Sequence, residues 1–209
     1  MALSWLILGA GGHGRSVADA IAAHGDLVMG FLDDGLPVGC LVNGISVLGG
    51  LSYVRELQPL FAATPQGSPD HLVVAIGNPV LRQTWQQHLE HVGAPLGAVI
   101  HPRASVSASA QVAPGCVVLG GAVVNANACL HPGVLVNSGA VVDHDAICDA
   151  FSQLGVNAAM AGGSRLGPLA CLAPGEVLAC GQTRSAASEC GTSDLDSAEG
   201  SASLSSARP

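Results

Sequence analysis

A period of six residues in the second half of the chain limits its possible folds more than any other feature. From residue 100 to residue 178, every sixth position is apolar. These positions are Ile100, Val106, Val112, Val118, Val124, Leu130, Val136, Val142, Cys148, Leu154, Met160, Leu166, Leu172 and Leu178. A period of six fits neither an amphipathic helix nor a simple alternating strand. It predicts a short strand and a corner, repeated, with the apolar residue inside and small residues, Gly or Asn at the corners.

The beginning of the chain combines an apolar run, a glycine-rich loop and a helical pattern. Residues 5–8 predict a buried parallel strand, and residues 15–21 have helical spacing. Between them lies the loop that contains Gly9, Gly11, Gly12, His13 and Gly14. Glycines in such a loop let backbone N–H groups approach an anion at the helix N-terminus, so the loop predicts a nucleotide-phosphate site. The alternative is a tight turn without a ligand.

Two further apolar runs are predicted strands, and polar residues follow each of them. Residues 27–32 end in Asp33 and Asp34, where a Rossmann-type domain contacts a ribose or a base. Residues 72–76 are followed by Asn78 and by a predicted helix that carries Arg82. Residues 1–98 are short for a complete dinucleotide fold, so they favour a single nucleotide over NAD. A nicotinamide-dependent reductase is therefore a remote alternative.

Composition narrows the class of partner. The formal net charge of −8 argues against nucleic acid and against an anionic membrane surface as a partner. The apolar run at residues 5–8 has no basic segment before it, and no run is long enough for a membrane span, which predicts a cytoplasmic protein. No C-x-x-C or H-x-E-type spacing suggests a metal-binding cluster, so we expect no metal site.

Several motifs together resemble a known family. The stretches L-I-L-G-A-G-G-H-G-R-S-V-A-D, G-F-L-D-D, A-I-G-N-P and I-H-P-R-A-S-V, followed by the hexads, resemble the hexapeptide-repeat nucleotide-sugar acetyltransferases of bacterial glycan synthesis. That family includes UDP-4-amino-sugar N-acetyltransferases and sialic acid O-acetyltransferases. The resemblance implies a Rossmann-like nucleotide-sugar-binding domain at residues 1–98. It also implies a left-handed parallel β-helix at residues 99–181, with acetyl-CoA as co-substrate and no permanently bound cofactor.

The resemblance also implies which residues bind the two substrates. The expected contacts to a UDP-amino-sugar are Gly9, Gly11, Gly12, Gly14, Asp33 and Asp34, with Asn78 and Arg82 nearby. His13 either caps the loop or donates a hydrogen bond to the sugar nucleotide. Acetyl-CoA lies between β-helices of neighbouring subunits in this family, which implies a homotrimer. On the donor side we expect Gln153, Gly162 and Gly163, with Gln153 standing where a second histidine is common.

The stretch D-H-D at residues 143–145 is the candidate catalytic motif. An amine must be neutral to attack a thioester, and its proton must leave as the tetrahedral intermediate forms. A histidine near its normal pKa suits that role, and a neighbouring carboxylate can fix its tautomer. By resemblance, His144 is the general base and Asp145 its orienting partner, with Asp143 the weaker choice. The alternative is a solvated histidine at a β-helix corner.

The repeat pattern weakens toward the C-terminus. Small corner positions are replaced by Glu176 and Gln182, which a solenoid interior would not accept unpaired. Residues 182–209 are rich in Ser, Ala, Gly and acidic residues, so we expect a disordered tail. The predicted function is acetyl transfer from acetyl-CoA to the amino group of a UDP-amino-dideoxy sugar. The alternatives are O-acetylation of a sugar or sialic acid, an inactive truncated nucleotide-sugar-binding homologue, and a purely structural solenoid.

Overall fold

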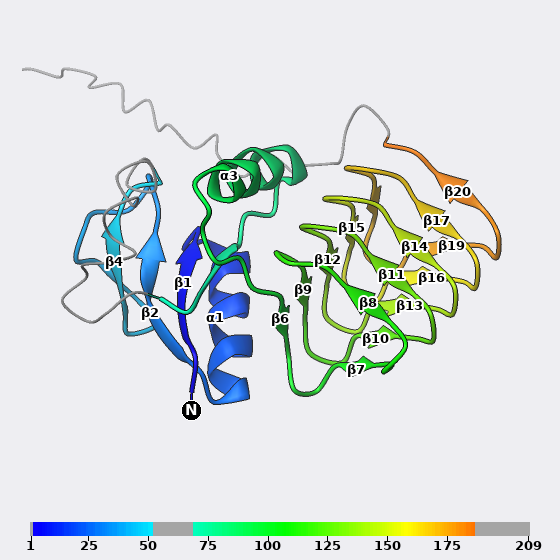
Figure 1. Ribbon diagram of the computed structural model, residues 1–209, viewed down its shortest axis with the longest axis horizontal. Helices are drawn as coiled ribbons and strands as arrows, with labels where there is room; N and C mark the ends of the chain where they lie inside the picture. Colours follow the sequence, from blue (N-terminus) through cyan, green and yellow to red (C-terminus); the bar gives the residue numbers. More distant parts are fainter. Residues whose placement is uncertain (1, 52–68, 187–209) are drawn as a thin grey trace, which may run out of the picture.

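A computed structural model of the protein describes residues 2–51 and 69–186. Figure 1 shows an N-terminal layer of strands and helices beside a solenoid of very short strands. The N-terminal elements are β1 (Ser4–Leu8), α1 (Gly12–His24), β2 (Leu27–Leu32), β3 (Leu41–Val42), β4 (Ile45–Gly49), β5 (His71–Val74) and α3 (Pro79–His91). The solenoid comprises β6 (Val99–Ile100), β7 (Ser105–Val106), β8 (Gln111–Val112), β9 (Val117–Val118), β10 (Val123–Val124), β11 (Cys129–Leu130), β12 (Leu135–Val136), β13 (Val141–Val142), β14 (Ile147–Cys148), β15 (Gln153–Leu154), β16 (Ala159–Met160), β17 (Arg165–Leu166), β18 (Cys171–Leu172), β19 (Val177–Leu178) and β20 (Thr183–Arg184).

The N-terminal sheet has the strand order β3-β4-β2-β1-β5. The pairs β1–β2, β1–β5 and β2–β4 are parallel, and β3 joins β4 as an antiparallel hairpin. The three strands predicted from the apolar runs are therefore confirmed. The chain leaves β1 toward β2 on one side and places β5 on the other. The carboxyl end of β1 is thus the switch point of the sheet, the usual place for a ligand in open α/β sheets.

Apolar residues on both faces of this sheet fix its position in the molecule. On one face, Ile7 and Phe31 pack with Val17 of α1 and with Val117 and Leu135, which belong to the solenoid. The other face packs against α3. Helix α1 therefore lies between the sheet and the solenoid strands β6, β9 and β12, as Figure 1 shows.

The solenoid stacks parallel strands into three sheets within the described residues, with orders β18-β15-β12-β9-β6, β19-β16-β13-β10-β7 and β20-β17-β14-β11-β8. Val124 pairs with Val142, the residue eighteen positions later, so three hexads make one coil. The predicted inward positions from Val118 to Leu178 form one buried cluster. Burial of these branched side chains is the principal force that holds the coils together. The hexad pattern thus predicted the repeat and one set of its interior residues. The small residues two positions before them, such as Ala122 and Ala140, were expected at the corners but are buried in the same cluster.

The corners share one backbone conformation. From residue 115 to residue 181, every sixth residue has a positive φ. Glycine holds most of these positions, and the others are Asn127, Asp145, Phe151, Asn157 and Leu169. Glycine takes left-handed angles without strain, and Asn and Asp tolerate them better than other residues. Asp145 therefore occupies a backbone position that would ordinarily be glycine.

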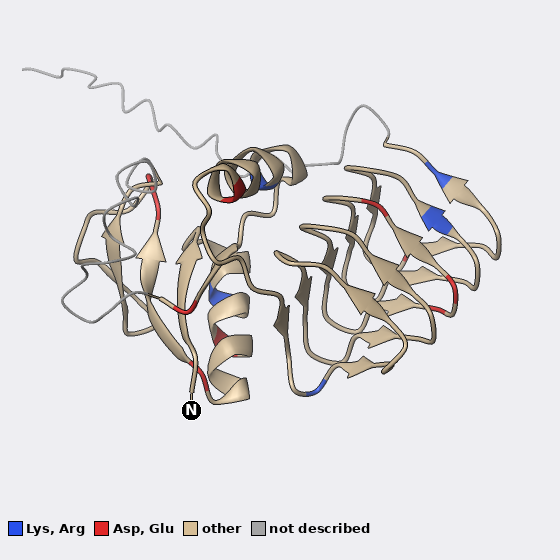
Figure 2. Cartoon of the chain, in the orientation of Figure 1, with Lys and Arg blue, Asp and Glu red and all other residues tan. Residues whose placement is uncertain are grey.

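The last coil corrects the predicted boundary at residue 182. Strand β20 pairs with β17, so the solenoid continues to Arg184. Glu176, expected to interrupt the repeat, accepts a hydrogen bond from the backbone N–H of Ala173 and forms an ion pair with Arg184. The charged residue thus acquires partners instead of being buried alone. Arg165 and Arg184 are the basic residues on β17 and β20 in Figure 2. The remainder of the predicted disordered tail, residues 187–209, lies outside the described residues.

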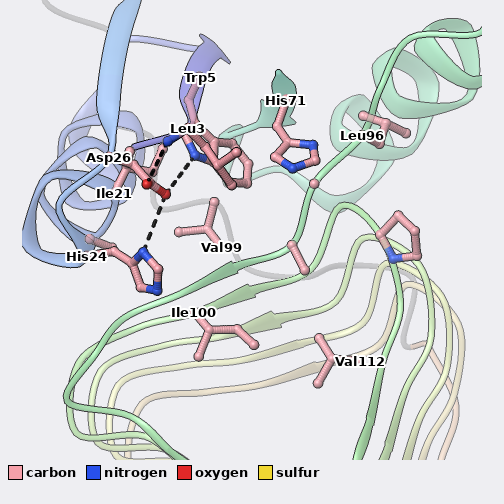
Figure 3. Close-up of a pocket in the computed structure, with 14 residues that line it drawn as sticks. Leu3, Trp5, Ile21, His24, Asp26, His71, Leu96, Val99, Ile100 and Val112 are labelled. Carbon is pink, nitrogen blue, oxygen red and sulfur yellow. Dashed lines mark hydrogen bonds and ion pairs between the residues drawn. The ribbon is translucent and has the colours of Figure 1, made fainter. Parts of the chain in front are cut away.

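The first coil is only partly covered by the N-terminal domain. Ile100 and Val112 are partly buried, and with Trp5 they line a cavity of about 390 Å³ between the two domains. In this cavity Asp26 accepts a hydrogen bond of 3.1 Å from the indole Nε1 of Trp5 (Figure 3). The ring of His71 lies 4.8 Å from the Trp5 ring, centroid to centroid. The domains are therefore joined by apolar contact along one side of the first coil.

Candidate active site on the solenoid

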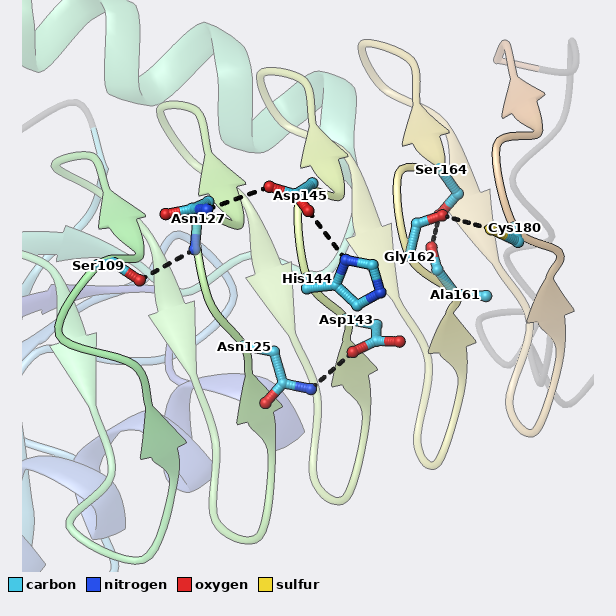
Figure 4. A network of polar contacts seen from close by, with 10 residues as sticks. All are labelled: Ser109, Asn125, Asn127, Asp143, His144, Asp145, Ala161, Gly162, Ser164 and Cys180. Atoms are coloured by element: carbon cyan, nitrogen blue, oxygen red, sulfur yellow. Dashed lines mark hydrogen bonds and ion pairs between the residues drawn. The ribbon is translucent and has the colours of Figure 1, made fainter.

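His144 lies at the corner between β13 and β14, on the side of the solenoid formed by the sheets of those two strands. Its side chain is 60% exposed, and that of Asp145 is 58% exposed. An exposed imidazole is accessible to a substrate, so this position excludes the purely structural role of a core histidine. The corner residues of successive coils stack here, which brings residues eighteen positions apart into contact (Figure 4).

The imidazole has a fixed partner. Nδ1 of His144 lies 2.9 Å from Oδ2 of Asp145. A carboxylate only accepts hydrogen bonds, so Nδ1 carries the proton in this pair and the lone pair of Nε2 is free to act as a base. This hydrogen bond is also the main reason that the pKa of His144 is raised above its ordinary value, with the charge of Asp143 adding to it.

Asp143 points to a different partner. Its Oδ1 accepts a hydrogen bond of 2.8 Å from Nδ2 of Asn125, one coil earlier. That hydrogen bond, followed by the backbone N–H of His144, holds the pKa of Asp143 below its ordinary value. Asp145, not Asp143, is therefore the carboxylate that orients the imidazole ring, in agreement with the sequence-based preference.

Two expected donor-side glycines lie on the next coil. Gly162 sits above His144, and a methyl group built on its α-carbon would stand 2.4 Å from Nε2. Gly163 has a φ of +65° and open space beside it. Gly162 thus provides the room that the imidazole ring occupies, and Gly163 allows the corner to turn. Both lie on the coil that follows His144; their expected contact with acetyl-CoA stays a prediction.

The four glycines of the loop fall into two kinds: Gly9 and Gly14 are closely packed against the backbone, and Gly11 and Gly12 are exposed. Gly9 has a φ of +102°, and a Cβ on it would stand 2.8 Å from the carbonyl oxygen of Ala75. A Cβ on Gly14 would stand 2.0 Å from the carbonyl oxygen of Gly9, so this glycine allows α1 to pack on β1. Gly11 and Gly12 are exposed; a Cβ on Gly11 would meet no atom within 4 Å, and one on Gly12 would stand 3.9 Å from Nη2 of Arg15. The N-terminus of α1 therefore presents bare backbone at the switch point of the sheet, where an anion is best bound.

The predicted acidic and amide contacts have structural partners. Asp33 accepts hydrogen bonds of 2.8 Å from the backbone N–H groups of Ala10 and Gly35, and Asp34 accepts one from that of Leu51. The side chain of Asn78 caps the N-terminus of α3, where it accepts hydrogen bonds from two backbone N–H groups. Asp33 thus holds the glycine loop itself, and Asn78 fixes the helix beside it. These residues shape the switch point.

His13 lies in the first turn of α1. Its Nε2 is buried and has no hydrogen-bond partner among the described residues. Burial, together with the nearby charge of Arg82, lowers the pKa of His13 to about 4. The ring is therefore neutral at physiological pH. Its hydrogen-bonding capacity at the loop is retained without a charge.

The structure corrects the expected role of Arg82. Its guanidinium is buried at the junction of the two domains, where it donates hydrogen bonds to the carbonyl oxygens of Ile76, Gly133 and Phe151. It also donates to Oε1 of Gln153 at 3.2 Å. A side chain that is 1% exposed and bound in this way links α3 to the solenoid rather than contacting a ligand. Gln153, expected near acetyl-CoA, is held by this arginine and lines a neighbouring cavity of about 530 Å³.

The glycine loop and His144 lie on different sides of one chain. The N-terminal domain packs on the outer face of β6, β9 and β12, whereas His144 lies at the corner between the other two sheets. The sequence analysis assigned both to one reaction. A single site that used both would therefore have to combine two copies of the chain.

Residues 2–51 and 69–186 contain neither a metal-binding cluster nor a membrane-spanning helix. This part of the chain contains no group of three His, Cys, Asp or Glu side chains placed to hold a metal ion. Over the same ranges, every helix is too short or too polar to cross a bilayer.

Asn125 and Asn127 were missed by the sequence analysis, although a signal existed. They precede Asp143 and Asp145 by one coil of eighteen residues, so the register derived from the hexads places each pair together.

Comparisons with known proteins agree with this geometry. Residues 5–89 match the family described as the PglD N-terminal domain. The chain is similar to the acetyltransferase domain of PglB from Neisseria gonorrhoeae FA1090 in complex with acetyl coenzyme A. The identity is 33%, the match covers 89% of this chain and 86% of that chain, and the TM-score is 0.79. It is similar to PerB from Caulobacter crescentus in complex with CoA and GDP-perosamine, with 33% identity, 88% and 83% coverage, and a TM-score of 0.78.

A more distant likeness concerns the fold alone. WeeI from Acinetobacter baumannii AYE is 18% identical, with 86% of this chain and 92% of that chain covered and a TM-score of 0.64. A search of the curated proteins finds no significant match.

Proposed function

This chain belongs to the hexapeptide-repeat nucleotide-sugar acetyltransferases, and we propose that it transfers the acetyl group of acetyl-CoA to the amino group of a nucleotide-linked amino sugar. The observation that carries the proposal is the exposed pair of His144 and Asp145 in a chain that is 33% identical to the acetyltransferase domain of PglB and to a GDP-perosamine N-acetyltransferase. The product would serve bacterial surface glycan synthesis. Because both proposed substrates are cytoplasmic metabolites, we place the reaction in the cytoplasm.

In the proposed reaction His144 acts through Nε2. The amine of the sugar attacks the carbonyl carbon of the thioester, and Nε2 accepts the proton that the amine loses. Asp145 keeps Nδ1 protonated and stabilises the imidazolium that forms. The C–S bond then breaks, and the CoA thiolate leaves and takes the proton held on Nε2, which returns His144 to its neutral form. The amide product retains the acetyl group. Gly162 leaves space at Nε2 for this proton transfer.

The acceptor nucleotide is proposed to bind at the switch point of the N-terminal sheet. Gly11 and Gly12 offer bare backbone at the N-terminus of α1, where a diphosphate gains both N–H donors and a favourable helix dipole. Asp33 and Asn78 hold the loops on either side. His13 supplies a neutral ring to the same loop. The family resemblance favours uracil as the nucleobase of the acceptor. Guanine is the competing choice because PerB was solved with GDP-perosamine.

A homotrimer is part of the proposal. The glycine loop and His144 lie on different sides of one chain, so the acceptor site of one copy would have to face the base of another. Acetyl-CoA would then lie along stacked corners near Gly162 and Gly163. Gln153 would complete the donor side from the junction with Arg82.

The test is thiol release from acetyl-CoA with either a UDP-4-amino-4,6-dideoxy sugar or GDP-perosamine as acceptor. We expect turnover with one of them, loss of turnover in His144→Ala, and retention in His131→Ala, a matched exposed histidine on the same solenoid. If His144→Ala retained wild-type turnover, His144 would not be the general base. Absence of thiol release with both acceptors in the unmodified protein would contradict N-acetylation of such sugars.

A further inference from the structure

Two asparagines lie directly beneath the two aspartates that flank His144. Asn125 and Asn127 belong to the coil that precedes Asp143 and Asp145, at the same corner. Figure 4 shows two pairs of side chains, Asn125 with Asp143 and Asn127 with Asp145, and the imidazole of His144 lies between the two aspartates. Each asparagine donates its amide N–H to the aspartate above it. The two aspartates are thereby held in different orientations.

Asn127 determines which way Asp145 faces. Its Nδ2 lies 3.2 Å from Oδ1 of Asp145, while Oδ2 of the same carboxylate lies 2.9 Å from Nδ1 of His144. Oδ1 of Asp145 thus accepts a hydrogen bond from Asn127 on the preceding coil, and Oδ2 is directed at the imidazole. Asn127 is itself fixed, because its backbone N–H donates to Oγ of Ser109 at 3.1 Å. The chain of contacts therefore crosses three coils.

Asn125 has the complementary effect on Asp143. It draws that carboxylate toward the preceding coil at 2.8 Å, so Asp143 influences the imidazole of His144 through its charge. Two carboxylates adjacent to one histidine could otherwise compete for Nδ1, and the ring would have two orientations. On the next coil the ring lies against Gly162, whose carbonyl oxygen accepts a hydrogen bond of 3.0 Å from the thiol of Cys180, one coil further on. The ionisable groups facing the imidazole are thus Asp143 and Asp145.

We propose that Asn127 is a positioning residue for the acetyl transfer: by holding Oδ1 of Asp145, it directs Oδ2 to Nδ1 of His144 and leaves Nε2 as the atom that accepts the proton. Asn125 supports this arrangement by keeping Asp143 from Nδ1. The role in catalysis rests on the proposed function. The orientation of the imidazole does not, and it can be measured independently.

The backbone at these positions decides which variants are informative. Asn127 has a φ of +59°, so alanine there would add strain that has nothing to do with the amide. Glycine removes the side chain and retains the conformation. Asn157 has a φ of +56° at another corner, is exposed, and lies on a different side of the solenoid. Asn157→Gly is therefore the matched control for Asn127→Gly.

The experiment combines NMR of the histidine side chains with kinetics in the full chain. In Asn127→Gly we expect the ¹⁵N shifts of His144 to move from one Nδ1–H tautomer toward a mixture, and its pKa to fall toward the ordinary value. Asp145→Asn should move both readouts in the same direction and further. His144→Ala identifies the resonance. Asn157→Gly should leave both readouts unchanged. Unchanged tautomer and pKa in Asn127→Gly would overturn the proposal.

Kinetics then separate the positioning role from the proposed function. We expect kcat to fall about tenfold in Asn127→Gly, a part of the ~10²–10⁴-fold that a general base contributes, with KM for acetyl-CoA unchanged. A higher KM for acetyl-CoA with an unchanged kcat would contradict a positioning role. If the unmodified protein releases no thiol with either amino sugar, the proposed function fails, while the NMR result still decides whether Asn127 orients His144.

Discussion

Nε2 of His144 lies against the α-carbon of Gly162, the residue one coil further along the chain. A methyl group on Gly162 would stand 2.4 Å from this nitrogen, closer than any ordinary contact of a Cβ atom. The two residues are neighbours because the solenoid stacks positions eighteen apart. The smallest side chain in the corner therefore lies beside the atom that is proposed to accept the proton.

The first prediction concerns Gly162→Ala. The backbone is compatible with alanine, and the ring of His144 is exposed, so the ring should turn away and the fold should persist. Because a misplaced base loses its alignment with the amine, we expect kcat to fall roughly 10–100-fold with little change in thermal stability. The double variant Gly162→Ala/His144→Ala should be no slower than His144→Ala alone. A further loss in the double variant would mean that Gly162 acts independently of the histidine.

The second prediction is a pH dependence. The base must be neutral, and the hydrogen bond that His144 donates to Asp145 raises the pKa of His144. The value of kcat/KM should therefore rise with pH through a pKa above the ordinary histidine value and then level off. In Asp145→Asn the pKa should fall, so the acidic limb moves to lower pH while the plateau drops. Asp19→Asn, which removes an exposed carboxylate from α1, should leave the profile in place. A limb that does not move in Asp145→Asn would contradict the pairing.

The third prediction concerns the junction between the domains. Arg82 is buried, and its guanidinium binds carbonyl oxygens from both domains. Burial lowers its pKa to about 10, so it remains charged at neutral pH. Arg82→Met leaves several buried acceptors without donors, and we expect the free energy of unfolding to fall by about 3 kcal/mol. Urea titration measures this. Arg103→Met, at an exposed corner, should change stability by less than about 0.5 kcal/mol.

The fourth prediction separates two kinds of glycine in one loop. A Cβ on Gly14 would collide with the carbonyl oxygen of Gly9, whereas one on Gly11 would meet no atom within 4 Å. Gly14→Ala should destabilise the protein by about 1–3 kcal/mol, because α1 must move away from β1. Gly11→Ala should leave the melting temperature unchanged and weaken the binding of UDP or GDP in calorimetry. Equal nucleotide affinity in Gly11→Ala would argue that the loop is only a turn.

The fifth prediction tests whether two copies share one site. Gly12→Asp should block a diphosphate at the N-terminus of α1, and His144→Ala should remove the base, so each variant alone should be inactive. If one chain supplies the loop and another the base, unfolding and refolding the two variants together should restore part of the activity. Refolded mixtures without activity, while each variant still forms oligomers, would contradict a shared site.

Much of the fold could be predicted because it depends on local repetition. The hexads predicted the solenoid and its interior, since each inward residue is buried only against its counterparts on neighbouring coils. The end of the repeat could not be located in the same way. Glu176 suggested a break, yet an ion pair with Arg184 allows the coil to continue, and such a pairing depends on a residue that follows later in the chain.

The candidate site was predictable where the chemistry lies within a few residues. His144 is flanked by Asp143 and Asp145, so the motif predicted a carboxylate partner for the imidazole, and the family resemblance favoured Asp145, which makes the hydrogen bond. Arg82 was misassigned because its partners, Gly133 and Phe151, are backbone carbonyls about fifty to seventy residues away. A motif cannot distinguish an arginine that faces a phosphate from one that is buried between domains.

Because the corners stack, distance along the sequence corresponds to a fixed distance along the solenoid axis. Eighteen residues of sequence correspond to one step along its axis, about 4.8 Å in length. Duplicating any whole coil beyond Gly163 would lengthen the wall of the solenoid and leave His144 and its supports unchanged. Removing a single residue would put every later corner out of phase. Such a chain can therefore lengthen the wall that is proposed to bind the donor by whole coils, while the proposed base, His144, keeps its place.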